Sequence, residues 1–523
     1  MYQFENKDGY IYLKLITDEE LKELMDFLNS DKLLCLLVKI LRRYQKENDI
    51  SECNLVFDLT EAAKKAKIRK GNENYSKKTI GNKFTGLNKS ILEFITLRVF
   101  RQKKTLQNQL LIEQLLRRGK KSDTLSIITK KTKQRIEEDL EIVNTNPQNE
   151  FTYENKFKLY LFDYVLDVQS EKSHREKETN LQNAYDQIEY DYWLKKIKYV
   201  FVMLNREQIV NIKYEFKNFK FLLTYLQQQE LSEHPLIYLY YNILRLYLEA
   251  YQISFDENGQ SVKNDILNFN DDLFNFILNY LNENAKKITG NEQLQIYTAL
   301  SNICVKLERL GKIEYTQKRK EVYESLINNE VILVQGRISG NHFSNIISIG
   351  TTLKDKEWVI RCKERFESKL SKQVSIEVMA YNNTLIYFMD NKLEEAEMEL
   401  SKISDDIDFV YNLNVRTLRA KIYYERIEAL KTYQAISKAI NHFLPFLRRF
   451  IDYLKDDKNR KNTIVHEERR NAHKAFVETI IKMLNDIQEE KFIRGSVLEK
   501  IETSKLIVEK RWLLTKCENL SSI

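Results

Sequence analysis

Histidine and cysteine side chains are the groups with which this sequence could bind a metal or transfer a proton. The chain of 523 residues contains six histidines and five cysteines. His466 and His473 lie seven residues apart, on one side of a predicted helix but about 10 Å apart along its axis. One zinc ion cannot bind both, because its bonds to nitrogen are only about 2 Å long. No two cysteines have metal-ligand spacing and the sequence has no glycine-rich phosphate loop, so we expect no metal and no cofactor.

The segment from Arg460 to His466 could carry another kind of chemistry, since an arginine and a histidine flank five residues within a helical region. This spacing is similar to the motif of the HEPN-type helical ribonucleases. The resemblance implies that Arg460 stabilises phosphate charge and that His466 acts as an acid or base. A ribonuclease that uses these two residues is therefore one alternative function of the chain.

Positive charge is concentrated between residues 61 and 135. This stretch has 21 Lys and Arg residues and 5 Asp and Glu residues, a net charge of +16, whereas the whole chain carries +8. Such a stretch is typical of a surface that binds a polyanion, because neutralising phosphates releases their counterions. The alternatives are a merely solvated surface and a site for an acidic protein, a membrane surface or polyphosphate. The residues that we predict to bind a polyanion are Arg69, Lys70, Lys77, Lys78, Lys83, Lys89, Arg101, Lys103, Lys104, Arg117, Arg118, Lys120 and Lys121.

The order of elements within this stretch loosely resembles a winged helix. Helical patterns at Leu55–Lys67 and Lys77–Glu93 are joined by a loop. The segment Phe94–Phe100 alternates apolar and other residues, which is typical of a short strand. The residues that the second helix would then present are Lys77, Lys78, Lys83 and Lys89.

The composition predicts an all-α fold. The chain has 12 Gly and 3 Pro, far below the average usage of about 7% and 5%, and sheet folds need these residues at their many turns. The most apolar run, Leu33–Leu41, has nine residues and includes Lys39, whereas a membrane-spanning helix needs about 20. Met1–Ile16 has no continuous apolar stretch. We therefore expect no signal peptide, no membrane span and reduced cysteines in a cytoplasmic protein.

A recurrence of 34 residues is the strongest pattern in the sequence and is clearest over residues 294–409. When His342–Ser375 is set beside Ile376–Phe409, small residues, large residues and the predicted turn coincide. Small residues let paired helices approach closely, and large ones fill the space between pairs. The coinciding pairs are Gly350 with Thr384, Leu353 with Tyr387, Glu357 with Asn391, Cys362 with Ala396 and Phe366 with Leu400, and an earlier unit has Cys304, Leu307, Gly311 and Thr316 at the same mutual spacing.

This pattern resembles the tetratricopeptide repeat family, with Gly311, Phe366, Tyr387 and Ala396 at matching positions. The resemblance implies a right-handed solenoid of helix pairs with a concave surface that binds a macromolecule. The layout of the whole chain also resembles uncharacterised bacterial helical-repeat proteins. The residues predicted to line the partner groove are Asn302, Ser348, Thr351, Lys354 and Asn382.

The sequence therefore predicts two domains, a basic helical unit over residues 1–147 and a helical-repeat array over residues 148–523. The boundary lies in Asn144–Glu150, which holds a proline and has no apolar periodicity. We expect a non-enzymatic adaptor or scaffold that binds a protein or peptide partner on the concave surface. The first alternative is a nucleic-acid-binding regulator that uses residues 61–135, and the second is the ribonuclease described above.

Overall fold

The structure is a computed structural model, and its described part confirms the all-α prediction. About 80% of the chain is helical, and the described residues form 23 α-helices. Their one regular sheet is a small antiparallel pair, β1 (Ile253–Phe255) and β2 (Ser261–Lys263). No helix in this part of the chain has an apolar stretch long enough to cross a membrane. The described residues are 8–46, 54–68, 74–102, 104–118, 125–169, 174–209, 212–256, 259–263, 269–370, 376–404, 409–455, 467–489, 494–504 and 506–520.

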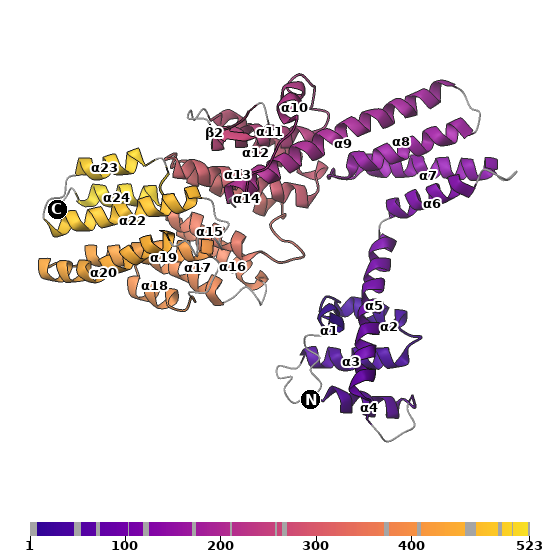
Figure 1. The fold of residues 1–523 in the computed structure, drawn as a ribbon, viewed down its shortest axis with the longest axis horizontal. Coiled ribbons are helices and arrows are strands. Elements are labelled where there is room, and N and C mark those ends of the chain that lie inside the picture. The colour runs from indigo at the N-terminus through magenta and orange to yellow at the C-terminus, as the bar shows by residue number, and fades with distance from the viewer. Residues whose placement is uncertain are drawn as a thin grey trace. The chain divides into compact units, whose positions relative to one another are not determined.

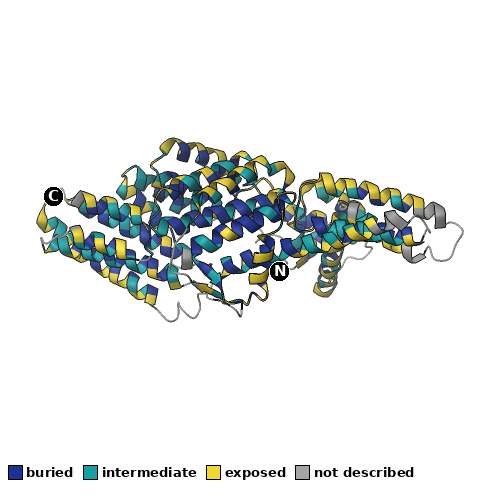
Figure 2. Cartoon of the chain, turned by 90° about the horizontal axis from the view of Figure 1, so that it is seen from above, coloured by how far each residue is buried: buried dark blue, intermediate teal, exposed yellow. Residues whose placement is uncertain are grey.

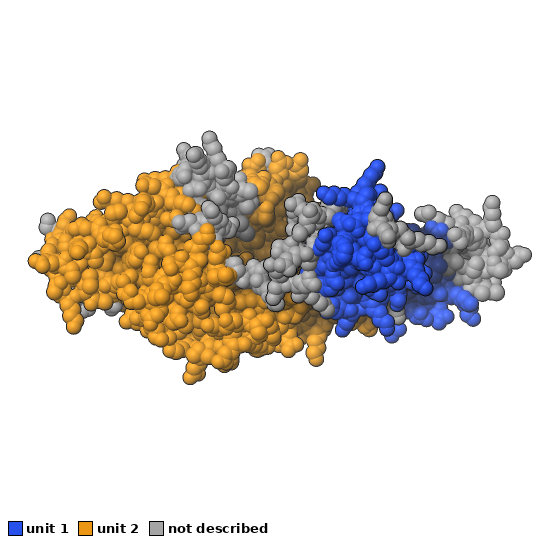
Figure 3. Space-filling view, turned by 90° about the horizontal axis from the view of Figure 1, so that it is seen from below, with its two compact units in different colours: residues 1–142, 158–182 blue, residues 143–157, 183–523 orange. Residues whose placement is uncertain are grey.

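The chain divides into two compact units, which Figure 3 colours separately. Unit 1 comprises residues 1–142 and 158–182, and unit 2 comprises residues 143–157 and 183–523. Helices α8 (Thr152–Gln169) and α9 (His174–Ile209) therefore each begin in one unit and end in the other. The boundary predicted after residue 147 falls within a segment of unit 2.

Helices α1 to α5 of unit 1 enclose one core of buried apolar side chains, which extends in sequence from Tyr10 to Phe94. Helix α2 begins with a capping box, in which Thr17 accepts from the backbone of Glu20 and Glu20 accepts from that of Thr17. The helices that precede α8 are α1 (Asp8–Leu13), α2 (Asp18–Phe27), α3 (Lys32–Lys46), α4 (Leu55–Lys65), α5 (Lys77–Gln102), α6 (Lys104–Arg118) and α7 (Leu125–Thr145) (Figure 1).

The strand predicted at Phe94–Phe100 is wrong, because this segment continues helix α5. Alternating spacings of four and three residues separate the buried side chains of α5, which are Ile80, Phe84, Leu87, Ile91 and Phe94. The helical period therefore extends into the segment, and Arg98 holds it in place by pairing with Glu20 and Glu23 of α2. The described residues of unit 1 contain no β-strand, so they lack the wing of a winged helix.

Unit 2 consists of consecutive helices that pack against their near neighbours in the sequence. Helix α11 packs on α12 and α13, α14 on α13 and α15, α17 on α15, α18 and α19, and α19 on α20 and α22. In Figure 2 the buried, dark blue parts of these helices gather toward the middle of unit 2, among teal and yellow ones. This pattern is consistent with a helical-repeat protein. After α9 the helices are α10 (Phe219–Leu226), α11 (Pro235–Tyr251), α12 (Asp271–Glu283), α13 (Gly290–Arg309), α14 (Tyr315–Asn328), α15 (Gly340–Thr352), α16 (Lys356–Phe366), α17 (Ile376–Met389), α18 (Leu393–Leu400), α19 (Phe409–Glu428), α20 (Tyr433–Lys455), α22 (Glu467–Gln488), α23 (Arg494–Thr503) and α24 (Lys510–Leu520), with short 3-10 turns η2 (Ala285–Lys287) and η3 (Glu367–Lys369).

Three helix pairs of unit 2 share one kind of turn, but these turns do not recur every 34 residues. Gly311, Lys354 and Asn391 each adopt a positive φ after the first helix of a pair. The residue after each of them donates its backbone N–H to a carbonyl five positions back, which closes the helix end. The turns are 43 and 37 residues apart, and Glu357, which we predicted at the turn, lies in the first turn of α16. The predicted turn at Glu357 is three residues from the observed turn at Lys354. Because three residues are close to one helical turn, the predicted alignment of the helix pairs was wrong, but the helix face predicted to be buried was right.

Gly350 confirms that a small residue brings two helices together. A Cβ atom at this position of α15 would overlap Val359 and lie 2.7 Å from Cε3 of Trp358, both on α16. Trp358 and Val359 are buried in the main core of unit 2. The α15–α16 pair therefore depends on the absence of a side chain at residue 350.

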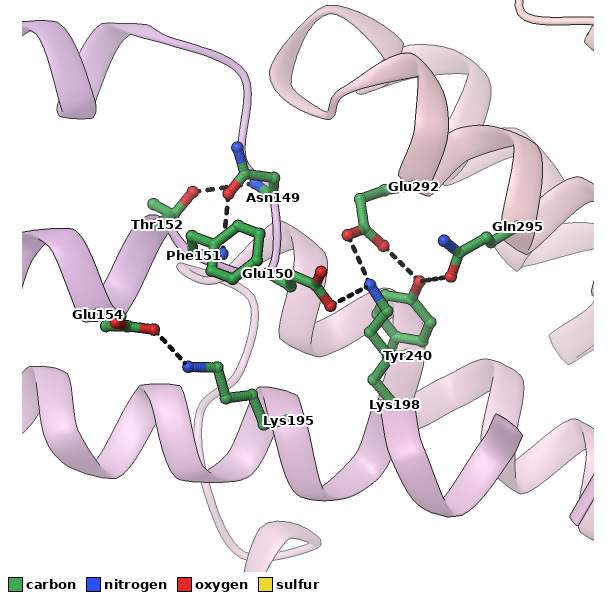
Figure 4. A network of polar contacts seen from close by, with 10 residues as sticks. All are labelled: Asn149, Glu150, Phe151, Thr152, Glu154, Lys195, Lys198, Tyr240, Glu292 and Gln295. Atoms are coloured by element: carbon green, nitrogen blue, oxygen red, sulfur yellow. Dashed lines mark hydrogen bonds and ion pairs between the residues drawn. The ribbon is translucent and has the colours of Figure 1, made fainter. Parts of the chain in front are cut away.

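A buried lysine joins three separate segments of unit 2 (Figure 4). The ammonium of Lys198 in α9, a side chain only 6% exposed, donates to Glu150 and to Glu292 of α13 at 2.8 Å in each case. Glu292 also accepts from the hydroxyl of Tyr240 in α11. Burial by itself would lower the pKa of Lys198, but the hydrogen bonds to the two carboxylates raise it above its ordinary value. The lysine therefore stays charged and fixes α9 to α13 and to the segment before α8.

The segment predicted as a linker makes further bonds inside unit 2. The backbone of Gln148 donates to the carbonyl of Lys287 at 2.7 Å and accepts from the backbone of Thr289 at 3.0 Å. Its side-chain oxygen accepts from the backbone N–H of Leu236, at the first turn of α11. The start of α8 is thus attached to α11 and to the turn before α13.

The C-terminal helices of unit 2 fold back onto its earlier helices. Lys306 on α13 pairs with Glu468 on α22 at 3.2 Å. Lys421 on α19 pairs with Glu509, just before α24, at 2.7 Å. One face of α13 and one face of α19 are therefore covered by the chain's own C-terminal segment.

His473 of α22 is buried in this contact. Its Nδ1 lies 2.9 Å from the hydroxyl oxygen of Thr417 on α19. Burial, followed by the charges of Arg309 and Arg469, lowers the pKa of His473 well below its ordinary value. The imidazole is therefore neutral at neutral pH.

We predict that Gly350→Ala destabilises unit 2. The added methyl group must displace Trp358 or Val359, and such overpacking costs about 1–3 kcal/mol. Gly495→Ala is the matched control, because a Cβ there meets nothing within 4 Å. Urea unfolding of both variants measures the free energy of unfolding, and equal stabilities would contradict the close contact between α15 and α16.

Lys198→Met should lower the free energy of unfolding by about 3–5 kcal/mol, because it leaves Glu150 and Glu292 charged without their buried cation. Lys195→Met on the same helix removes a more exposed ion pair with Glu154 and should cost about 1 kcal/mol or less. Denaturant unfolding at one fixed protein concentration compares the two variants. A smaller loss from Lys198→Met than from Lys195→Met would contradict the role of the buried cation.

Lowering the pH through about 6.5 should destabilise unit 2. A histidine kept neutral in the folded chain gains its proton only on unfolding, so stability present above its unfolded pKa is lost below it. The loss is about 1.4 kcal/mol at pH 5.5 for one such histidine. Burial also lowers the pKa of His234 and His342, so His473→Asn should reduce, but not abolish, the difference in stability between about pH 7.5 and pH 5.5.

His442→Asn is the control for this measurement, because His442 is exposed on α20. The pH dependence of unfolding should change more in His473→Asn than in this control. An identical pH dependence in His473→Asn and wild type would show that His473 titrates normally, against our interpretation.

Candidate nucleic-acid interface

Helices α4 and α5 of unit 1 form a helix–loop–helix, in which a residue just before the start of α5 is hydrogen-bonded to α4. Helix α4 begins at Asn54, whose side chain accepts from the backbone of Phe57. The loop that leads to α5 is attached to α4, since the backbone N–H of Tyr75 donates to the hydroxyl of the buried Thr60 at 3.1 Å. Ser76 then caps α5 by accepting from the backbone of Thr79 at 3.1 Å. These contacts fix the direction in which α5 starts.

The first half of α5 has a polar outer face without acidic residues. Residues 74–92 contain four lysines and no Asp or Glu. Because one side of the helix is buried in the core of α1 to α5, the opposite side faces solvent. The exposed side chains there, at spacings of four, three and four residues, are Lys78, Asn82, Thr85 and Lys89, with Lys77 beside them at the helix start. We call these five residues the α5 face.

The α5 face has the chemistry of a DNA-reading helix. Lysines contact phosphates or guanine, asparagine pairs with adenine, and threonine contacts either base edges or the thymine methyl group. From Lys78 to Lys89 the helix rises by about 16 Å, enough to follow a major groove about 12 Å wide.

Lys83, which we predicted to belong to this surface, has a structural role instead. Its half-buried ammonium donates to Asp31, at the start of α3, at 2.8 Å. Burial by itself would raise the pKa of Asp31, but hydrogen bonds from Lys83 and from the backbone of Leu34 and Leu33 lower it below its ordinary value. The charge of Lys83 is therefore neutralised within unit 1.

Of the remaining residues predicted to bind a polyanion, the structure describes the side chain of Arg101, which does not lie on the α5 face. Arg101 is exposed near the end of α5, about 18 Å along the axis from Lys89, and lines a shallow groove with the acidic Glu23 and Asp26. Lys104, Arg117 and Arg118 lie on α6, but their side chains are not among those described. Arg69, Lys70, Lys103, Lys120 and Lys121 lie outside the described residues.

Asn82 and Thr85 are the members of the α5 face that sequence reasoning missed. A count of charges does not find them, because both side chains are neutral. Their signal was present in the spacing, since they continue the stripe between Lys78 and Lys89. Marking the apolar stripe of Lys77–Gln102 and reading the opposite side would have identified them.

Part of the basic stretch outside α5 serves the fold. Lys133 on α7 pairs with Asp167 of α8 at 2.7 Å and with Asp163 at 3.7 Å, all within unit 1. Asn180 donates to Asp163 at 2.8 Å on the same side. Part of the positive charge of residues 61–135 is therefore used in structural pairs and part lies on the α5 face, while Lys65, Lys67, Lys130 and Lys131 are exposed elsewhere.

The predicted partner groove of unit 2 is not a row of exposed side chains. Asn382 is 1% exposed, and its amide donates to the carbonyl of Val378 at 2.8 Å and to Ser344 at 3.1 Å. Asn302 lies one helical turn before Lys306, on the face of α13 that the C-terminal helices approach. The prediction for Asn382 is therefore wrong, because the neighbouring helix α15 covers it. The other three residues are half-buried or exposed, namely Ser348, Thr351 and Lys354, the last at the turn with positive φ.

The two residues of the predicted ribonuclease motif, Arg460 and His466, lie outside the described residues. Among the side chains that are described, no three His, Cys, Asp or Glu groups are close enough to hold a metal ion. Burial raises the pKa of the Cys362 thiol to about 11, so this side chain is a core residue and not a nucleophile.

Comparison with protein-family models, with curated proteins and with solved structures found no match to this chain.

Proposed function

We propose that this chain binds double-stranded DNA through the α5 face of unit 1. The observation that carries the proposal is the exposed stripe of Lys78, Asn82, Thr85 and Lys89 on a helix whose first half has no acidic residue. An α-helix fits the major groove of B-form DNA, and lysines at both ends of the stripe are able to contact the phosphates that line it.

The same face is less suited to the other polyanions. A-form RNA has a deep, narrow major groove that a helix does not enter, so the α5 face favours DNA over duplex RNA. An interface for an acidic protein usually has an apolar or aromatic centre within a polar rim. None of the five residues of the α5 face is apolar. Contacts with phosphates and base edges require a surface that is polar over its whole area.

For unit 2 we propose the finer architecture that the sequence suggested. Its helix pairs form a right-handed, tetratricopeptide-like solenoid. We also propose that the protein is bacterial and cytoplasmic. The adaptor role, in which unit 2 binds a protein or peptide partner, stays a prediction. Its contact surface must omit the buried Asn382. In the combined proposal unit 1 binds DNA and unit 2 receives a second partner.

Replacing two lysines of the α5 face should weaken DNA binding without changing stability. Lys78→Gln with Lys89→Gln removes two phosphate contacts, so the slope of log affinity against log salt should fall in magnitude by about 2. Lys→Gln changes little at exposed helix positions, because the two residues have similar helix propensity. The measurement is fluorescence anisotropy of a labelled DNA duplex with the full chain at several salt concentrations.

Lys286→Gln with Lys354→Gln is the matched control, since it removes the same charge from exposed positions of unit 2. Asn82→Ala should leave the salt slope unchanged while it alters the preference among duplex sequences. Equal effects of the two lysine pairs, or tighter binding to duplex RNA than to DNA, would count against the proposal.

A further inference from the structure

Helix α9 has an exposed apolar stripe in unit 2, on the side opposite its buried residues Ile197 and Phe201. Spacings of three, four, seven and three residues separate its members, which are Tyr185, Ile188, Tyr192, Tyr199 and Val202. Their exposed fractions run from 39% for Val202 to 64% for Tyr185. We call these five residues the α9 stripe. Its heptad-like spacing is the one by which a helix packs along a second helix.

Helix α10 extends this apolar surface. The hydroxyl of Tyr225 on α10 donates to Glu189 of α9 at 3.0 Å, and its ring lies against Trp193. Phe221, one turn earlier on α10, is 79% exposed. Isolated apolar side chains are common on surfaces, but a contiguous patch of this kind marks an interaction site, and tyrosine is enriched at such sites.

The charges of α9 divide into two halves along the stripe. Residues 183–194 contain three acidic residues and no basic one, whereas residues 195–206 contain four basic residues and no acidic one. The acidic residues are Asp186, Glu189 and Asp191, and the basic ones are Lys195, Lys196, Lys198 and Arg206. Lys198 is held by Glu150 and Glu292, and Lys195 pairs with Asp191 and Glu154, so these charges are neutralised within unit 2. Glu189 and Lys196, one on each side of the centre, therefore carry the complementarity. A second α9 running in the opposite direction would set Glu189 of each copy beside Lys196 of the other. A parallel one would set like charges together.

We propose that two copies of this chain associate through antiparallel contact of their α9 stripes. The surface is self-complementary in both shape and charge, which is the requirement for a two-fold symmetric interface. A second, antiparallel copy accounts for both the apolar spacing and the opposite charges of Glu189 and Lys196. This inference is independent of the proposed DNA binding.

The heptad positions fix the register of the pair. In an antiparallel pair, the two core positions of each heptad face one another, which sets Tyr185 against Val202 and Ile188 against Tyr199 of the second copy. The central pair is Tyr192 with Lys195, whose ammonium stays paired with Glu154 and Asp191 of its own chain. The flanking position of Glu189 then lies against that of Lys196. Both side chains are partly exposed in the single chain, and Glu189 accepts from Tyr225 through its Oε1 atom. By symmetry, each contact occurs twice.

Sedimentation velocity of the full chain over a range of concentrations tests the proposal. The wild type should reach twice the mass of one chain, 62.6 kDa. Ile188→Glu should keep the protein monomeric where the wild type is dimeric. Glu189→Lys and Lys196→Glu, each alone, place like charges together at two symmetric sites and should raise the dimer Kd about tenfold or more. Combining the two substitutions should restore dimerisation.

Met398→Glu is the matched control, because Met398 is an exposed apolar residue on α18, and it should leave the dimer unchanged. Far-UV circular dichroism of each variant verifies that the helices remain folded. A wild type that stays monomeric, a dimer that survives Ile188→Glu, or single charge reversals that the double variant does not rescue would each overturn the antiparallel α9 contact.

Discussion

A buried ammonium group, that of Lys198, is the constraint on which the arrangement of unit 2 depends. An unpaired charge inside a protein is costly, so α9 must bring Lys198 to the carboxylates of Glu150 and Glu292. That requirement places one side of α9 against α11 and α13. The other side of the same helix is left facing solvent, and it is there that the apolar residues of the α9 stripe lie. One helix thus carries both a structural charge and a proposed contact surface.

The same separation of faces explains the site in unit 1. Helix α5 buries one stripe in the core, uses Lys83 to attach itself to α3, and leaves the α5 face exposed. The rigidity of a packed helix lets its exposed residues keep a fixed spacing, which reading of base edges requires. Charge alone would not distinguish this face from other lysine-rich helices. Two features distinguish the α5 face: positions 74–92 contain no acidic residue, and the face includes Asn82 and Thr85.

The fold class was predictable from the scarcity of Gly and Pro, and the close approach at Gly350 from the pattern of small residues. The turn between α15 and α16 was misplaced by three residues, because a shift of nearly one helical turn leaves the buried face almost unchanged, whereas the turns at Gly311 and Asn391 were predicted correctly. Phe94–Phe100 was predicted as a strand because a short alternating run was read without the longer helical stripe that precedes it. The burial of Asn382 and the pairing of Lys83 with Asp31 depend on contacts between distant segments, and no local pattern carries that information.

Chemical acetylation of lysines in the full chain, with and without duplex DNA, tests the proposed DNA interface most directly. Mass spectrometry reports how fast each amine reacts. The account predicts that DNA slows the reaction of Lys77, Lys78 and Lys89, while Lys286 and Lys354 in unit 2 react at an unchanged rate. Uniform slowing of all exposed lysines, or protection that omits these three, would contradict it.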